Sequence, residues 1–117
     1  MLIYEVNLEV DESINHKMAG WLPDHITEML GFDGFKAAHW YFRNPEDETP
    51  VAASSTEGSP GSTPKTLWTI HYLVESRAAL DDYLKNNALR MREEGKNRFG
   101  DQFTATRRIL NLLSVAG

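Results

Sequence analysis

Hydrophobic and polar residues alternate strictly at the start of the chain. Over residues 2–10, one side of the alternation carries Leu2, Tyr4, Val6, Leu8 and Val10, and the other carries Ile3, Glu5, Asn7 and Glu9. Successive side chains of a β-strand point to opposite faces of its sheet, so a period of two is typical of a strand with one dry face. We therefore predict a first β-strand over residues 2–10.

Three further segments carry the aromatic and β-branched residues that favour strands. They are residues 34–43, 65–75 and 102–113. The alternation is clear in the first two segments. It is less decisive in the last one, because apolar residues occupy both sides of it: Ile109, Leu110, Leu112 and Leu113.

Residues 13–30 change to a spacing of three and four residues, which indicates an amphipathic helix. Ser13 can cap its start and Gly31 can end it. Pro23 lies inside this segment and removes one backbone hydrogen bond, so we expect the helix to kink or restart there.

A second helical stretch follows the third strand, from the capping residue Ser76 to near Gly95 or Phe99. The order of elements is then β-α-β-β-α-β. Two β-α-β units with right-handed crossovers build a four-stranded antiparallel sheet with both helices on one face. We predict the α+β class and a ferredoxin-like sandwich, formed by a single domain over residues 1–117.

Residues 45–64 interrupt this pattern with Pro, Gly, Ser, Thr and acidic residues and offer almost nothing to bury. Such a composition is typical of a flexible connection, and a connection of this length is uncommon in a small domain. We expect a mobile loop between the second and third strands. The alternative is that this acidic loop binds a partner.

One face of the predicted sheet has no helix to cover it. The covered face takes Tyr4, Val6, Trp40, Phe42, Trp68 and Ile70, and the bare face takes Ile3, Glu5, Asn7, Ala37, His39, Tyr41, Thr69, His71, Arg107 and Ile109. The bare face is too apolar for a solvated surface and too polar for a core, and such patches mark interfaces. We predict a homodimer that pairs through this face and buries ~800 Å² per partner.

Composition narrows the classes of function. The chain has no cysteine, which excludes disulfides and cysteine nucleophiles and agrees with a cytoplasmic location. The formal net charge of −5 disfavours nucleic acid and anionic membranes as partners. Glu5 and Glu9 do not fit a signal peptide, and no apolar run approaches the ~20 residues that span a bilayer. No motif indicates a metal, a nucleotide or another cofactor.

Three stretches carry a family resemblance: the strand IYEVNLEV, the helix segment with Trp21, His25 and Ile26, and residues 83–110 with the elements LRMRE and RFGD. They resemble the bacterial family called domain of unknown function 4286, over nearly the whole chain except residues 44–64. That family resembles the dimeric α+β barrel superfamily, which includes cofactor-free monooxygenases, haem-degrading enzymes, lactone isomerases and ligand-sensing modules. The resemblance implies the fold and the dimer, but it implies no activity and no active-site residues.

The bare face also holds the candidate chemistry. His71, His39 and Glu5 are candidate catalytic residues, because an imidazole beside a carboxylate can act as a general base near neutral pH. The candidate ligand-binding residues are Asn7, Tyr41, Arg43, Thr69 and Arg107, and the arginines could hold an anionic substrate oxygen. The alternative, which we favour, is a hydrogen-bonded dimer interface without chemistry.

His25 interrupts the apolar stripe of the first helix. It is either a proton shuttle or haem ligand, or an edge-of-core histidine bonded to a backbone carbonyl, and we favour the latter. The basic residues between Arg90 and Arg98 have Glu93 and Glu94 among them, which predicts a solvated helix face.

The sequence leaves two functional hypotheses. The first is a homodimeric small-molecule-binding or structural protein with no activity. The second is a cofactor-free monooxygenase-like or isomerase-like enzyme that acts on a small organic substrate in a cavity between the two sheets. The two differ in whether His71 and its neighbours reach a closed pocket connected to solvent.

Overall fold

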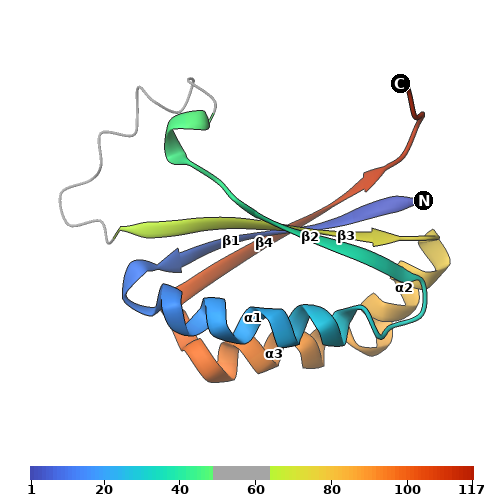
Figure 1. The fold of residues 1–117 in the computed structure, drawn as a ribbon. Coiled ribbons are helices and arrows are strands. Elements are labelled where there is room, and N and C mark those ends of the chain that lie inside the picture. Colours follow the sequence, from blue (N-terminus) through green and yellow to red (C-terminus); the bar gives the residue numbers. More distant parts are fainter. Residues whose placement is uncertain (49–63) are drawn as a thin grey trace.

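Four strands form one antiparallel sheet in the computed structural model, which describes residues 1–48 and 64–117 (Figure 1). They are β1 (Leu2–Asp11), β2 (Phe35–Phe42), β3 (Lys65–Val74) and β4 (Phe103–Asn111). Their order across the sheet is β2-β3-β1-β4, and each neighbouring pair is antiparallel. This is the predicted ferredoxin-like topology, so the fold class is confirmed. The loop expected over residues 45–64 falls mostly outside the described residues.

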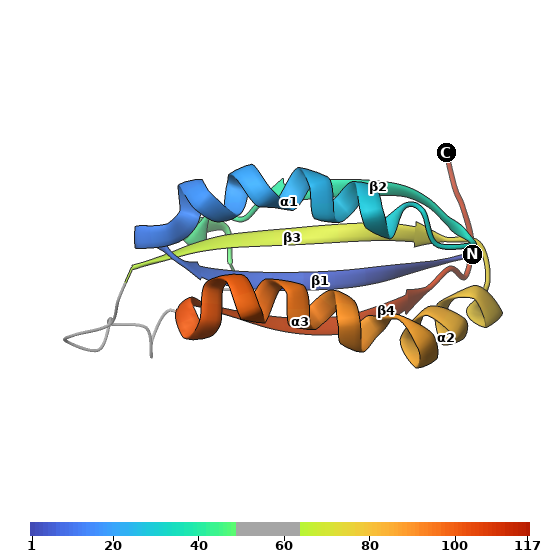
Figure 2. The ribbon, with the colours of Figure 1, turned by 90° about the horizontal axis from the view of Figure 1, so that it is seen from below.

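The α-helices lie together on one face of the sheet (Figures 1 and 2). They are α1 (Asn15–Met29), α2 (Arg77–Asn86) and α3 (Ala88–Phe99), accompanied by the 3₁₀ turns η1 (Glu12–Ile14), η2 (Pro45–Asp47) and η4 (Gly100–Gln102). Figure 2 shows α1 along β2 and β3, and α3 along β1 and β4. In residues 1–48 and 64–117, no helix combines the length and the apolar character that crossing a bilayer requires.

The second helical stretch is broken, where one continuous helix was expected. Ser76 caps α2 as predicted, because its Oγ accepts a hydrogen bond from the backbone N–H of Ala79 at 3.1 Å. At Asn87 the backbone leaves helical geometry, with a φ of −132°, and α3 starts anew at Ala88. Asparagine competes with the helix for backbone hydrogen bonds, which favours a break at this position.

The first helix also differs from the prediction. Ser13 does not cap it, because this residue lies within η1 and the helix begins at Asn15 without a side-chain cap. Pro23 does not interrupt α1, which continues to Met29. Thr27 lies one turn further and donates a hydrogen bond through its hydroxyl to the carbonyl of Pro23 at 2.9 Å.

The hydrophobic core fills the space between the sheet and the helices. Its largest fully buried side chains are Tyr72, Met18, Ile70, Leu80, Met91, Val10 and Val74. Trp40 and Phe42 point to the helix side, as predicted, but they are 37% and 68% exposed rather than covered. The twist of the sheet explains the difference, since it carries the end of the edge strand β2 away from the helix layer (Figure 1).

Candidate functional site

The face of the sheet opposite the helices, called the open face below, is organised in rows across the strands. An apolar row holds Ala37, Leu73, Ile3 and Leu110. A charged row holds His39, His71, Glu5 and Arg108, and a third row holds Tyr41, Thr69, Asn7 and Thr106. This register brings six of the eight predicted site residues together on one surface.

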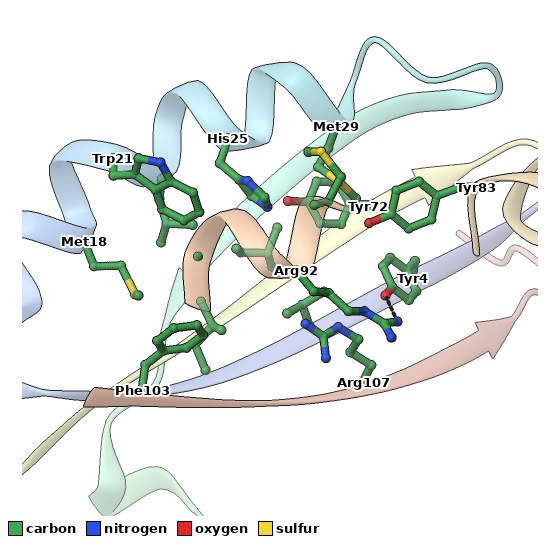
Figure 3. A pocket seen from close by; sticks show the side chains of 16 residues that line it. Tyr4, Met18, Trp21, His25, Met29, Tyr72, Tyr83, Arg92, Phe103 and Arg107 are labelled. Carbon is green, nitrogen blue, oxygen red and sulfur yellow. Dashed lines mark hydrogen bonds between the residues drawn. The ribbon is translucent and has the colours of Figure 1, made fainter. Parts of the chain in front are cut away.

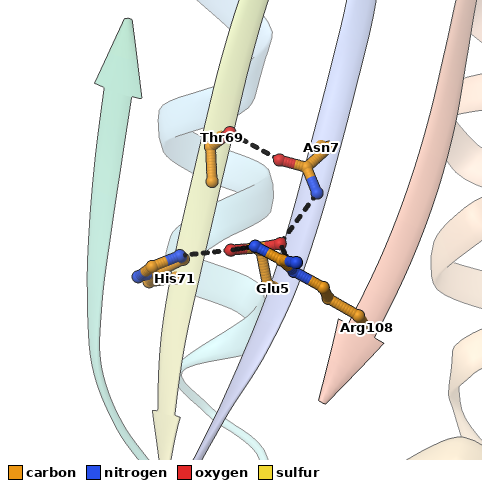
Figure 4. A network of polar contacts seen from close by, with 5 residues as sticks. All are labelled: Glu5, Asn7, Thr69, His71 and Arg108. Atoms are coloured by element: carbon orange, nitrogen blue, oxygen red, sulfur yellow. Dashed lines mark hydrogen bonds and ion pairs between the residues drawn. The ribbon is translucent and has the colours of Figure 1, made fainter. Parts of the chain in front are cut away.

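Glu5 lies at the centre of a hydrogen-bond network on the open face (Figure 4). His71 donates through Nε2 to Glu5 Oε1 at 2.8 Å, and Arg108 donates to both carboxylate oxygens from the other side. Asn7 donates through Nδ2 to Glu5 Oε2 at 2.9 Å and accepts from the Thr69 hydroxyl at 2.6 Å. These neighbours leave the Glu5 side chain only 5% exposed, although no helix covers it.

The electrostatics of Glu5 argue against a role as a base. Burial opposes its ionisation, but hydrogen bonds from Arg108, Asn7 and His71 outweigh that effect and lower its pKa to about 2. A general base works best when its pKa lies near the operating pH. Glu5 is therefore a permanently ionised, fully engaged carboxylate, which suits a structural role in this face.

The other predicted residues of the open face lie around this network. The ring of Tyr41 packs edge-on against His71 with 5.4 Å between ring centroids, and His39 faces His71 in the strand register. Arg43 pairs with Glu48, next to η2, at 2.7 Å. Figure 1 shows η2 raised over the open face, and the surface between them is a broad hollow rather than a closed pocket.

Arg107 does not belong to this surface, contrary to the prediction. It pairs in register with Val6, whose side of β1 faces the helices, and Ile109 likewise pairs with Tyr4. Arg108 takes the expected place on the open face. Because apolar residues occupy both sides of β4, the sequence does not show which of its residues face the helices. The pairing with β1 determines this.

A cavity lies on the other side of the sheet, beneath α1 and α3 (Figure 3). Its wall is mostly apolar and aromatic, with Met18, Trp21, Met29, Tyr72 and Phe103 among the lining residues. Its volume is about 70 Å³. One water needs roughly 10–15 Å³ on this measure, so the cavity has room for a small organic molecule. We call it the helix-side cavity.

His25 is the histidine in the wall of the helix-side cavity. Its ring stacks on Trp21 with 4.5 Å between ring centroids. Its buried Nδ1 has no hydrogen-bond partner within the described residues, and Glu94 Oε2 lies 3.8 Å away. Burial lowers the pKa of His25 and Glu94 only partly opposes this effect, so the imidazole is neutral at pH 7 and able to accept a proton.

Two arginines stand at the mouth of the helix-side cavity, Arg92 from α3 and Arg107 from β4. Arg92 donates through Nη2 to the hydroxyl of Tyr4 at 3.1 Å (Figure 3). Within residues 1–48 and 64–117, neither guanidinium forms an ion pair with a carboxylate. Both also line the groove outside the cavity, together with Lys96 and Asp101.

A comparison with known protein families shows which family this chain belongs to. Residues 1–113 match the family described as a domain of unknown function, DUF4286. The chain belongs to the DUF4286 family. This confirms the predicted resemblance, and the match extends across the segment 44–64 that the resemblance left out. No curated protein matches the chain.

The DUF4286 chain shares its fold with several solved structures. A proposed antibiotic biosynthesis monooxygenase from Deinococcus radiodurans is 10% identical with a TM-score of 0.67, over 100% of this chain and 97% of that one. SnoaB, a cofactor-independent oxygenase from Streptomyces nogalater, is 7% identical with a TM-score of 0.63, over 97% and 95% of the two chains.

A de novo designed protein, Foldit4, also shares the fold, at 8% identity and a TM-score of 0.56, over 96% of this chain and 98% of that one. A protein designed from first principles carries no inherited activity. At these identities the likeness shows the architecture, and the function of the DUF4286 chain has to be argued from its own residues.

The sequence did not single out the helix-side cavity. Its aromatic and methionine residues fall on regular apolar stripes, so they were interpreted as core, and Arg92 was interpreted as part of a solvated helix face. The available signal was His25, an isolated polar residue on an apolar stripe. It became informative only once the structure placed Arg92 and Arg107 beside the same cavity.

Proposed function

We propose that this DUF4286 protein is a homodimeric small-molecule-binding protein that holds its ligand in the helix-side cavity. The proposal is carried by a cavity with an aromatic wall and by the polar groups that line it. The buried Nδ1 of His25 has no hydrogen-bond partner in the described residues. Arg92 and Arg107 at the mouth form no ion pair with a carboxylate there and lie beside the Tyr4 hydroxyl. Apolar walls with a few convergent polar groups are typical of ligand sites. A cytoplasmic location is part of the proposal, supported by the acidic sequence without cysteine.

The dimer part of the proposal is supported by the open face. Its apolar row lies directly beside the charged row, so the sheet presents a continuous mixed surface that no α-helix of the described chain covers and that η2 overhangs at one end. The tail after β4 adds exposed apolar side chains, Leu112, Leu113 and Val115, and Figure 1 shows it rising on this side of the sheet. A second copy is the partner whose sheet matches this shape and charge pattern.

An enzymatic role is the second candidate, because two structures with this fold are named as oxygenases. A cofactor-free oxygenation requires a base that deprotonates an organic substrate, which then reduces molecular oxygen. His25 could serve as that base in the helix-side cavity. This differs from the sequence-based hypothesis, which placed the reaction between two sheets. The expected result is oxygen uptake with a bound phenolic substrate that is lost in His25→Gln, and unchanged uptake would exclude this role.

The binding proposal is tested by the indole N–H signals of the three tryptophans in a proton–nitrogen correlation spectrum. Trp21 lines the helix-side cavity, whereas Trp40 and Trp68 pack against each other towards the β2 edge of the sheet, with 5.0 Å between ring centroids. Titration with one-ring aromatic compounds is expected to shift the Trp21 signal and leave the other two in place. Shifts confined to Trp40, Trp68 or the open face would contradict a ligand in this cavity.

A further inference from the structure

The charge at the mouth of the helix-side cavity is unusual for this protein. The chain has a formal net charge of −5, yet the mouth collects Arg92 and Arg107 without a carboxylate partner in the described part of the chain. Arg90 and Arg108, by contrast, pair with glutamates. Both arginines are exposed at the mouth, so water screens their mutual repulsion without abolishing it, and an anion between them would remove it.

The lowered pKa of Arg107 is consistent with this repulsion. Burial lowers its pKa first, Tyr4 opposes the effect, and Arg92 lowers the pKa further. An anion placed between the two guanidiniums would remove this repulsion and gain charge-assisted hydrogen bonds. The Tyr4 hydroxyl, which already accepts from Arg92, can donate its own proton to the same anion.

The cavity wall behind the arginines limits the size and shape of the rest of the ligand. Trp21 and Phe103 both lie close to the backbone of Gly95, whose lack of a side chain lets α3 approach them. The available volume of about 70 Å³ corresponds to on the order of five water molecules, which is the space of a single ring. Flexible methionines such as Met18 and Met91 complete the apolar surface and adapt to a flat ring.

Resting on the binding function proposed above, we propose that the ligand is a one-ring organic acid. Its carboxylate lies between Arg92, Arg107 and the hydroxyl of Tyr4, and its ring lies in the cavity beside Trp21 and Phe103. His25 faces the ring from α1 and offers its buried Nδ1 to a polar substituent. The neutral counterpart of such an acid lacks the charge that these arginines recognise.

Benzoate and benzamide test this inference, because they have nearly the same shape and differ in charge. Both are titrated into the protein while the Trp21 indole signal is followed. Benzoate is expected to bind at least tenfold more tightly than benzamide, and added salt is expected to weaken benzoate alone. If the two affinities are equal and the Trp21 signal still shifts, the proposal of an acidic ligand is overturned but the binding function stands. No movement with either compound would overturn both.

Variants assign the preference to the two arginines. Arg92→Gln and Arg107→Gln are each expected to weaken benzoate binding more than benzamide binding, so that the benzoate-to-benzamide affinity ratio falls at least tenfold. Arg77→Gln, which makes the same charge change on α2 away from the cavity, is expected to keep the ratio. A ratio that survives in both arginine variants would overturn the assignment. If a variant fails to fold, the salt dependence of benzoate binding to the unmodified protein tests the charge preference instead.

Discussion

A buried carboxylate on a surface without a covering helix needs several partners, and Glu5 has them. Arg108 reaches it from β4, His71 from β3 and Asn7 from its own strand. Each partner lies in a different position around the two oxygens, so the network fixes the mutual register of three strands. At the scale of the residue, Glu5 is best understood as a structural anchor that the sequence had suggested as a catalytic group.

This role predicts how stability depends on pH. The pKa of Glu5 falls from 4.5 to about 2 in the folded protein. Its contribution to the free energy of unfolding is therefore present above pH 4.5 and is lost as the pH falls toward 2, by up to about 3 kcal/mol. Denaturant unfolding at neutral pH and at acidic pH should show this loss in the unmodified protein and a much smaller one in Glu5→Gln.

Glu9→Gln is the matched control, because Glu9 lies on the same face and the same strand but is exposed. Its variant should follow the unmodified protein at every pH. If Glu5→Gln shows the same acid sensitivity as Glu9→Gln, the network around Glu5 does not stabilise the fold.

The elements show where a pattern in the sequence is sufficient and where it is not. Strict alternation predicted β1 and β3 and their faces, because the period of a strand is a local property. Arg107 was misplaced because both sides of β4 are apolar, and only pairing with β1 distinguishes them. The break at Asn87 was missed because the apolar spacing continues through it, from Tyr83 to Met91.

Helix α3 provides a prediction at this scale through Gly95. A methyl group at Gly95 would lie 3.4 Å from both Trp21 and Phe103, in ordinary contact and next to the helix-side cavity. Gly95→Ala should raise the free energy of unfolding by about 0.5–1 kcal/mol, because glycine is a poor helix former. The same variant should weaken binding of one-ring ligands, measured by the Trp21 signal, because the methyl group narrows the cavity.

Gly20→Ala separates the two effects. Gly20 lies in the interior of α1, and a methyl group added there would have nothing within 4 Å beyond its chain neighbours and the backbone of its own helix, so this variant gains helix stability without touching the cavity. It should be stabilised to a similar degree and bind ligands as the unmodified protein does. Unchanged binding in Gly95→Ala as well would contradict the location of the ligand beside Trp21 and Phe103.

At the scale of the whole molecule, the helix-side cavity could not be predicted from the sequence. A void depends on how Trp21 on α1, Gly95 on α3 and Phe103 on β4 fit together, and no periodicity reports a space that side chains leave empty. The open face could be predicted, since it follows from the topology alone: two crossovers of the same hand place all helices on one side. Under the proposed function, pairing and ligand binding therefore lie on opposite sides of the sheet.

This separation predicts that dimer formation and ligand binding respond to different variants. Leu110 lies in the apolar row of the open face and is 36% exposed, so Leu110→Glu leaves the core intact but places a charge where the second copy would pack. Light scattering should give twice the chain mass of 13.3 kDa for the unmodified protein. The dissociation constant should rise at least tenfold in Leu110→Glu, because a charge without a partner is costly to bury.

Leu89→Glu makes the same change on the outer surface of the helix layer, where Leu89 is 72% exposed. It should remain a dimer. Both variants should keep the response of the Trp21 signal to a ring compound, since neither residue lines the cavity. If only Leu89→Glu dissociates the dimer, the interface lies on the helices. The open face would then be a solvated surface that the hydrogen bonds of Glu5 stabilise without a second copy.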